Sequence, residues 1–237
     1  MLVSEGNPLI DIHTHVLPMV DDGSDNMETS LNMLKESARQ GITDVVLTPH
    51  YRGRYVATAE QLKTAFDDFK TEVSKHQIPV NLYLGQEISI NKDVKDMLKA
   101  GELLTMNGTK FALIEIDYDG STEVAEEVYE LKRQGFIPII AHVERFPYVS
   151  LQDVVEIKSL GGYIQVNASS IVRKDSRTDR KKVKKLFKYG LVDFVASDIH
   201  SNRVNVMQDA FEIVKKKYGE DTANAVFNEN AKKIIEG

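Results

Sequence analysis

Short apolar runs alternate with amphipathic segments from one end of the sequence to the other. The runs are rich in valine and isoleucine and nearly continuous in apolar character, which is typical of parallel strands covered on both faces. They predict strands at residues 9–13, 45–48, 82–88, 111–116, 137–142, 163–167 and 194–197.

Between these strands, apolar residues recur every three or four positions, as they do on one face of a helix. The first helix is expected to begin with a capping box formed by Asp25 and Glu28, and the second with one formed by Thr58 and Gln61. Further helices are expected about residues 94–98, 124–131, 151–160, 181–189, 205–218 and 222–235.

Strict alternation of strand and helix predicts an α/β fold with a parallel sheet and right-handed crossovers. A closed or nearly closed β/α barrel is the favoured architecture, and an open doubly wound sheet is the alternative. Because no linker or change of composition divides the 237 residues, we expect a single domain over residues 1–237.

Composition limits the possible chemistry, partners and location of the protein. The sequence has no cysteine, which excludes disulfides, thiolate metal sites and a cysteine nucleophile. Its formal net charge of −6 argues against nucleic acid as the main partner. No apolar run approaches the roughly 20 residues of a membrane span and no secretory signal is visible, so a cytoplasmic location without membrane insertion is expected.

A histidine or a carboxylate stands at or just after the C-terminal end of most predicted strands, which is the end where β/α barrels build their active sites. Five of the six histidines fall at such ends, whereas His76 is expected to end a helix at the surface. The residues at these ends are His13, His15, Asp22, His50, Glu87, Glu115, His142, Asn167, Asp198 and His200.

Imidazoles and carboxylates that converge on one rim are suitable ligands for divalent metal ions. The nine histidines and carboxylates among these residues are too many for one ion, so two or three ions are expected, with a carboxylate bridging them. The mixed nitrogen and oxygen ligands favour manganese, iron, zinc or magnesium, and manganese is our expectation. The alternative is a set of hydrogen-bonded polar residues that cap the barrel.

The order and spacing of these residues resemble the polymerase and histidinol phosphatase (PHP) family of metal-dependent phosphoesterases over nearly the whole chain. Local motifs resemble one branch of it, the bacterial tyrosine-protein phosphatases encoded with capsule and exopolysaccharide genes. These motifs are Asp-Ile-His-x-His followed by Asp-Asp-Gly, Thr-Pro-His, Gly-Gln-Glu, Ala-His-Val-Glu-Arg and Ala-Ser-Asp-x-His.

The resemblance implies a distorted parallel (β/α)7 barrel of the PHP type with three metal ions. The ligand groups that it implies are His13, His15, Glu87 and Asp198; Glu87, Glu115 and His142; and Asp22, His50 and His200. It further implies that Arg145 and Arg203 contact the substrate phosphate. The alternative for Arg145 is that it pairs with Glu144 or packs on Phe146, and the alternative for Arg203 is that it caps the next helix.

The branch also implies a phosphotyrosine protein as substrate, usually the tyrosine-rich tail of a bacterial tyrosine kinase, and a role in capsule or exopolysaccharide synthesis. The expected reaction is in-line attack of a metal-bridging hydroxide, without a phosphoenzyme. The sequence leaves the oligomeric state open.

Other functions remain as alternatives: a histidinol phosphatase or other small-molecule phosphatase, a non-catalytic metal-binding PHP module, and a metal-dependent amidohydrolase. An amidohydrolase typically uses a carboxylated lysine at a strand end, where this chain has glutamate. The strongly basic segment 173–188 either steers an acidic, phosphorylated peptide or is a solvated helix face.

Overall fold

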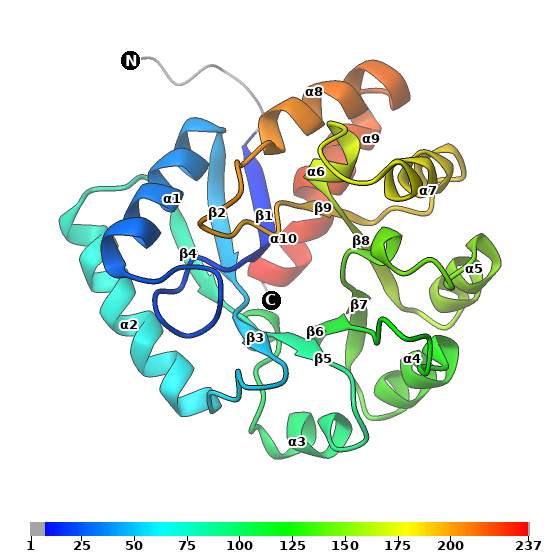
Figure 1. Ribbon diagram of the computed structural model, residues 1–237, viewed down its shortest axis with the longest axis horizontal. Coiled ribbons are helices and arrows are strands. Elements are labelled where there is room, and N and C mark those ends of the chain that lie inside the picture. Colours follow the sequence, from blue (N-terminus) through cyan, green and yellow to red (C-terminus); the bar gives the residue numbers. More distant parts are fainter. Residues whose placement is uncertain (1–7, 237) are drawn as a thin grey trace.

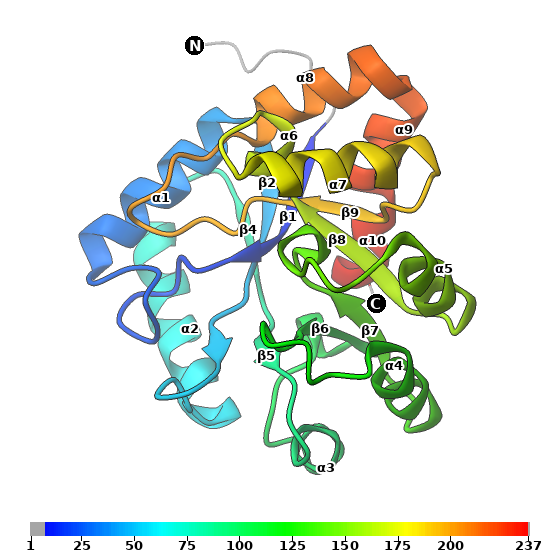
Figure 2. The ribbon, with the colours of Figure 1, turned by 45° about the vertical axis from the view of Figure 1, so that its right-hand side comes forward.

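The computed structural model describes residues 8–236, which form an α/β fold with a parallel sheet curled into a half-barrel and helices around its outside (Figures 1 and 2). The strands pair in two parallel sheets, ordered β1-β2-β4 and β3-β5-β6-β7-β8-β9. Their bounds are β1 (Leu9–Thr14), β2 (Ile42–Leu47), β3 (His50–Tyr51), β4 (Asn81–Leu84), β5 (Glu87–Ser89), β6 (Phe111–Glu115), β7 (Ile137–Ile140), β8 (Tyr163–Asn167) and β9 (Phe194–Ala196). The predicted parallel α/β class is confirmed.

The first and last strands lie beside each other. Thr14 forms a parallel bridge with Ile199, which lies three residues beyond β9. The Asp198 N–H donates to His13 O at 2.9 Å, and the His15 N–H donates to Ile199 O at 3.1 Å. These bonds bring the residues that follow β9 against the end of β1.

Two strands are interrupted shortly before His50 and Glu87, two of the candidate metal ligands. The predicted strand 82–88 breaks at Gly85 and Gln86 into β4 and β5, and Pro49 separates β2 from β3. The backbone at Gly85 passes so close to Met106 that a Cβ there would lie 2.7 Å from its Sδ. After the breaks β3 pairs with β5, so that His50 lies opposite Glu87.

The helices cover the outer face of the sheet, and most of the predicted ones are present. Their bounds are α1 (Met27–Arg39), α2 (Ala59–Lys75), α3 (Val94–Ala100), α4 (Val124–Arg133), α5 (Leu151–Ser159), α6 (Ala168–Ile171), α7 (Arg177–Lys188), α8 (Met207–Tyr218), α9 (Glu220–Asn224) and α10 (Asn230–Ile235). Short 3₁₀ turns occur at Met106–Gly108 and Val143–Arg145. In place of the single helix predicted at 222–235, a π-helical segment, Ala225–Glu229, joins α9 to α10.

One predicted capping box is present and the other is wrong. Thr58 and Gln61 form the expected box at the start of α2. At α1 the N-cap is Asn26, whose side chain accepts a hydrogen bond from the Thr29 N–H at 2.9 Å. Asparagine is as good an N-cap as aspartate, and the cap therefore lies one residue later than the sequence pattern indicated.

Apolar side chains fill the space between the sheet and the helices, and a smaller cluster joins the strands to the C-terminal helix. In that cluster Ile12, Leu113 and Phe194 pack with Ile234 of α10, which lies close to β1 (Figure 1). Each of these side chains is almost fully buried, which stabilises the fold by about 1.5–3 kcal/mol apiece. Across residues 8–236 no helix has the length and apolar character needed to cross a membrane.

The loop after β1 folds back onto the end of that strand through Gly23. A Cβ built at Gly23 would lie 2.0 Å from His15 O and 2.2 Å from His15 Cβ, so no side chain fits. The Ser201 N–H donates to Gly23 O at 2.7 Å, which ties this loop to the segment after β9.

We expect Gly23→Ala to push this loop off His15, to lower the free energy of unfolding by more than about 1 kcal/mol and to weaken metal binding. Urea unfolding followed by circular dichroism and a metal titration measure the two effects. Asp25→Ala, at an exposed position of the same loop, is the control and should be nearly neutral. A Gly23→Ala variant as stable as the control would contradict the close packing of this loop on His15.

Candidate metal centre

The two histidines at the end of β1 lie side by side in the protein interior. His13 Nε2 and His15 Nε2 are 3.1 Å apart, and both side chains are fully buried. The predicted shared face is therefore confirmed. Two buried imidazole nitrogens that point at the same space are arranged as they are around a metal ion.

Glu87, the first residue of β5, lies among four imidazoles. Its Oε2 is 2.7 Å from His50 Nδ1, 3.3 Å from His15 Nε2 and 3.4 Å from His13 Nε2. Its Oε1 is 2.8 Å from His142 Nε2. Burial raises the pKa of Glu87, but His13 and the other imidazoles outweigh it and hold that pKa well below its usual value. The carboxylate is thus ionised and can bridge two cations.

Asp198 follows β9 and divides its two oxygens between different partners. Oδ1 lies 3.5 Å from His15 Nε2 and 3.6 Å from His200 Nδ1. Oδ2 accepts hydrogen bonds from Arg203 at 2.9 Å and Asn167 at 3.0 Å, and it pairs with Arg145 at 2.8 Å. Burial opposes ionisation of this carboxyl, yet the positive groups around it keep the pKa of Asp198 far below its ordinary value.

Three further residues form the outer part of the cluster. Asp22 Oδ1 lies 3.5 Å from His50 Nε2 and 3.6 Å from His200 Nε2, and the Asp22 side chain is 45% exposed. Burial, followed by repulsion from His15, lowers the pKa of His200 to about 4, so its imidazole is neutral near pH 7 and its nitrogen can bind a metal.

Glu115, at the end of β6, is the remaining predicted ligand. Its Oε1 is 3.8 Å from His142 Nε2. Arg52 donates to both Glu115 oxygens, at 3.0 and 3.1 Å. Tyr118 Oη also donates to Glu115, at 3.4 Å, and burial together with the Glu115 charge raises the pKa of Tyr118 to about 12. The contact between Arg52 and Glu115 was not predicted from the sequence.

The structure therefore brings all nine predicted ligands to one end of the sheet. Four overlapping groups of them are close enough to hold a metal ion: His15, His50 and His200; His13, Glu87 and His142; His13, His15 and Asp198; and His50, Glu87 and Glu115. Although His50 Nδ1 and Glu87 Oε2 are in contact, neither has a hydrogen-bond partner within residues 8–236. Buried lone pairs without a proton donor suit a cation between them.

Two supporting residues orient these ligands, and neither was predicted to do so. Asp21 Oδ2 lies 2.7 Å from His15 Nδ1 and accepts the His50 N–H at 3.0 Å. Burial alone would raise the pKa of Asp21, but the hydrogen bond to His15 outweighs burial and lowers this pKa to about 2. Gln165 Oε1 lies 3.1 Å from His13 Nδ1 and accepts the His142 N–H at 2.8 Å. A polar residue inside the apolar strand 163–167 was the available signal for Gln165.

The remaining predictions for this region have mixed outcomes. Both arginines bind Asp198, so the pairing of Arg145 with Glu144 and the helix cap by Arg203 are not what the structure contains. Glu144 is buried and accepts hydrogen bonds from the Asn167 N–H and from Ser170 Oγ. His76 is the exposed C-cap of α2, as predicted.

A cavity of about 130 Å³ opens over this cluster. Histidines and carboxylates of the cluster line it on one side. Arg52, Arg145, Arg203 and Tyr118 line it as well. An anion that entered this cavity would meet cationic side chains next to the candidate metal ligands.

Comparison with known proteins identifies the family. Residues 9–236 match the family described as capsular polysaccharide synthesis, CpsB/CapC. The chain belongs to the CpsB/CapC family. This confirms the resemblance to capsule-associated tyrosine phosphatases that the motifs predicted.

Relatives in this family include named phosphatases. Tyrosine-protein phosphatase CpsB of Streptococcus agalactiae serotype V is 34% identical over 238 residues, which cover 96% of this chain and 98% of that protein. Tyrosine-protein phosphatase YwqE of Bacillus subtilis is 31% identical, over 96% of this chain and 91% of that protein.

The fold agrees with solved structures. A chain from the crystal structures of YwqE from Bacillus subtilis and CpsB from Streptococcus pneumoniae, described as metal-dependent tyrosine phosphatases, matches with a TM-score of 0.90 at 30% identity. The match covers 96% of this chain and 94% of that one. The phosphotriesterase homology protein of Escherichia coli, at 12% identity and a TM-score of 0.62, shares the fold alone.

We expect Asp21→Asn to weaken metal binding by about 10- to 100-fold, because the amide cannot carry the charge that holds the His15 ring in place. Calorimetric titration of the metal-free protein with Mn²⁺ measures the change. Asp25→Asn, in the same loop but exposed, serves as the control. Equal affinities for the two variants would show that Asp21 does not support the site.

Proposed function

We propose that this chain is a metal-dependent protein-tyrosine phosphatase that acts on phosphotyrosine of a bacterial tyrosine kinase and so regulates capsule or exopolysaccharide synthesis. The observation that carries the proposal is the convergence of five histidines and four carboxylates beneath a cavity with three arginines. The tyrosine-protein phosphatase relatives support it across almost their whole length.

The proposed ligands form three groups around Glu87. His13, His15, Glu87 and Asp198 would hold one ion, and Glu87, Glu115 and His142 would hold a second, with Glu87 shared between the two groups. Asp22, His50 and His200 would hold the third. Ligand atoms within 3.4–3.8 Å of one another support the assignment. Manganese is the expected metal.

Divalent ions bound here would supply a nucleophilic hydroxide at neutral pH and would polarise the phosphoryl oxygens. The four ligand carboxylates neutralise part of the charge of three such ions and leave two positive charges, which suits a phosphate dianion. The neutral His200 imidazole and the ionised Glu87 and Asp198 carboxylates have the protonation states that ligands need. Burial lowers the pKa values of His13 and His15, but the neighbouring carboxylates outweigh it and raise them, so metal binding here would release protons from these two imidazoles.

Arg145 and Arg203 position the phosphate. Each uses a guanidinium nitrogen on Asp198 Oδ2, and each lines the cavity. A guanidinium has five N–H donors, so both residues keep donors for phosphoryl oxygens. The contact with Asp198 fixes their orientation, and this reduces the entropy lost when substrate binds.

The leaving group requires little help. A tyrosine hydroxyl has a pKa near 10, so its oxygen leaves readily once the phosphoryl charge is neutralised. The cavity of about 130 Å³ accommodates a phosphate group, with the tyrosine ring near Tyr118 at the rim. The 55% exposure of Tyr118 leaves one part of its ring free for that contact.

For the domain organisation, we infer a single PHP domain over residues 1–237. For its architecture, we infer a distorted (β/α)7 barrel, in which β2 and β3 count as one interrupted strand and β4 and β5 count as another. The bridge between Thr14 and Ile199 supports closure of the curled sheet. The absence of a membrane-spanning helix from residues 8–236 is consistent with the expected cytoplasmic location.

The direct test compares substrates with and without metal. The Mn²⁺-loaded protein should hydrolyse a phosphotyrosine peptide at least about 100-fold more efficiently than histidinol phosphate, a difference in transition-state binding of about 3 kcal/mol. Chelation should abolish the activity and added Mn²⁺ should restore it. A preference for histidinol phosphate would support the small-molecule alternative, and no turnover with metal bound would support the non-catalytic module.

His13→Ala should remove metal and activity together while leaving the far-ultraviolet circular dichroism nearly unchanged. His76→Ala is the matched control, because it removes the one histidine outside the cluster. Elemental analysis and the peptide assay provide the measurements. Full metal content and activity in His13→Ala would end the proposal for this ligand.

Arg145→Ala should lower kcat for the phosphotyrosine peptide by about 100-fold, as expected when a charged donor to the transition state is lost. Arg39→Ala, an exposed arginine on α1 that pairs with Glu36, is the control and should have normal kinetics. Metal content should stay normal in both variants. An unchanged kcat in Arg145→Ala would remove this residue from the proposed machinery.

A further inference from the structure

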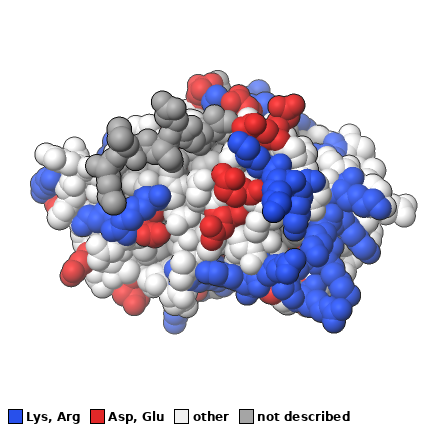
Figure 3. Space-filling model, turned by 90° about the horizontal axis from the view of Figure 1, so that it is seen from above, with Lys and Arg blue, Asp and Glu red and all other residues white. Residues whose placement is uncertain are grey.

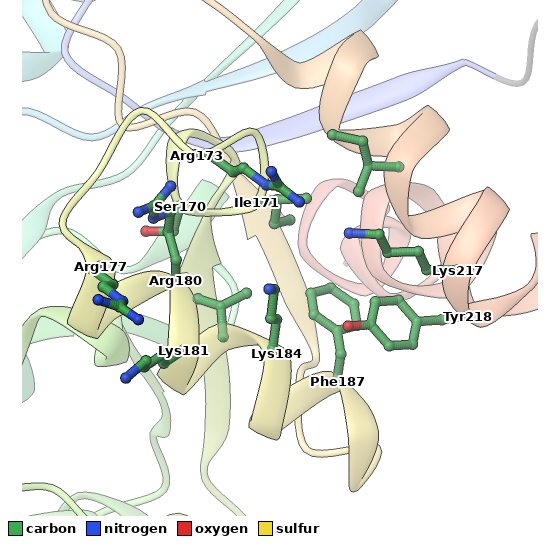
Figure 4. A pocket seen from close by; sticks show the side chains of 12 residues that line it. Ser170, Ile171, Arg173, Arg177, Arg180, Lys181, Lys184, Phe187, Lys217 and Tyr218 are labelled. Carbon is green, nitrogen blue, oxygen red and sulfur yellow. The ribbon is translucent and has the colours of Figure 1, made fainter.

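A second cavity lies between α6, α7 and α8 and shares no residue with the candidate metal centre. Its volume is about 320 Å³. No aspartate or glutamate is among its lining residues. Its charged residues, which define the basic pocket, are Arg173, Arg177, Arg180, Lys181, Lys184 and Lys217 (Figure 4).

These six cations have no ionic partners within residues 8–236. By contrast, Arg39 pairs with Glu36 in α1, and Arg133 pairs with Glu130 in α4. Figure 3 shows a broad area of lysine and arginine side chains on one part of the surface, although the net charge of the chain is −6. Positive charge is therefore gathered here and left unneutralised.

The spacing on α7 increases the repulsion. Arg177, Lys181 and Lys184 stand at intervals of four and three residues, which places them on one face of the helix. Like charges at these intervals destabilise a helix by about 0.2–0.5 kcal/mol per pair. In addition, Arg180 Nε is buried and has no hydrogen-bond partner in the described part of the chain. A bound anion would relieve the repulsion and satisfy this buried donor.

The basic pocket also has an aromatic wall. The rings of Phe187 and Tyr218 stack with centroids 4.8 Å apart and planes 13° from parallel. In Figure 4 the Lys184 and Lys217 amines and the Arg173 guanidinium point into the space beside these rings. A ligand that uses the whole pocket therefore combines a phosphate-like anion with a flat apolar group.

The helices around the basic pocket also hold the turn that carries Arg145. Lys182 of α7 donates to Val143 O at 2.9 Å and to Phe146 O at 2.7 Å. Ser170 of α6, which lines the pocket, donates to Glu144 Oε1 at 2.9 Å. The basic pocket and the metal centre are thus neighbours joined through one 3₁₀ turn.

We propose that the basic pocket binds a second phosphotyrosine side chain of a multiply phosphorylated substrate while the first occupies the metal centre. The proposal rests on the proposed function. A phosphotyrosine has the dianion for the cations and the ring for the Phe187–Tyr218 wall. A hollow of side-chain size with an aromatic wall suits this occupant better than an anionic lipid surface, which pairs with an open basic face.

The test uses the metal-loaded protein, a peptide with two phosphotyrosines, the same peptide with one, and p-nitrophenyl phosphate. Arg177→Gln/Lys184→Gln should raise KM for the doubly phosphorylated peptide by about tenfold, as expected for two charge contacts. The kcat, the KM for the singly phosphorylated peptide and turnover of p-nitrophenyl phosphate should stay within about twofold. Lys185→Gln/Lys188→Gln, which removes the same charge from α7 outside the pocket, is the control.

Equal KM changes for the two peptides, or for the two double variants, would overturn the proposal in favour of general electrostatic attraction. Vesicles of phosphatidylserine and phosphatidylcholine test the lipid occupant; vesicle binding that Arg177→Gln/Lys184→Gln abolishes, with normal peptide KM, would also overturn it. If wild-type protein hydrolyses neither peptide, the proposed function fails. Calorimetry with the doubly phosphorylated peptide then still tests the basic pocket, where loss of binding in this variant supports the proposal and unchanged binding refutes it.

Discussion

The site depends on keeping one carboxylate, Glu87, ionised in a place that water does not reach. An unpaired charge at such a position costs several kcal/mol, so the surrounding groups have to compensate it. His13, His15 and His142 do so from the ends of β1 and β7. The break in the strand at Gly85 and Gln86 makes this arrangement feasible, because it lets β5 pair with β3 and sets Glu87 opposite His50. The strand is therefore interrupted directly before Glu87, the residue whose buried charge the proposed chemistry needs.

Two of the candidate metal ligands have a strained backbone. His142 and Asp198 have φ values of 29° and 50°. Residues other than glycine rarely adopt this backbone region, which costs about 1–3 kcal/mol per residue. Both are held there by side chains of β8. Gln165 accepts the His142 N–H, and Asn167 donates to Asp198 Oδ2. β8 lies between β7 and β9 and thus positions the candidate ligands that follow both neighbours, which explains why polar side chains occur in this buried, otherwise apolar strand.

Elements that follow a periodic rule could be predicted from the sequence. Apolar runs located the strands, and parallel strands bring their C-terminal ends together, so the ligand-bearing residues were correctly predicted to be neighbours. Contacts that depend on loop paths were not predictable in this way. Asp21 rather than Asp22 supports His15, because the loop folds back at Gly23. Arg52 reaches Glu115 across β5 from the loop that follows β3, a strand of two residues that no pattern marks. Helix α6 has four residues, too few to produce a period.

Asp198 links the candidate metal ligands to the groups that would hold the phosphate. Its Oδ1 faces His15 and His200, whereas its Oδ2 is bound by Arg145 and Arg203. A cation near Oδ1 withdraws negative charge from the whole carboxylate, and this weakens the hold of Oδ2 on the two arginines. Metal binding would therefore free part of the positive charge of the arginines for an incoming anion.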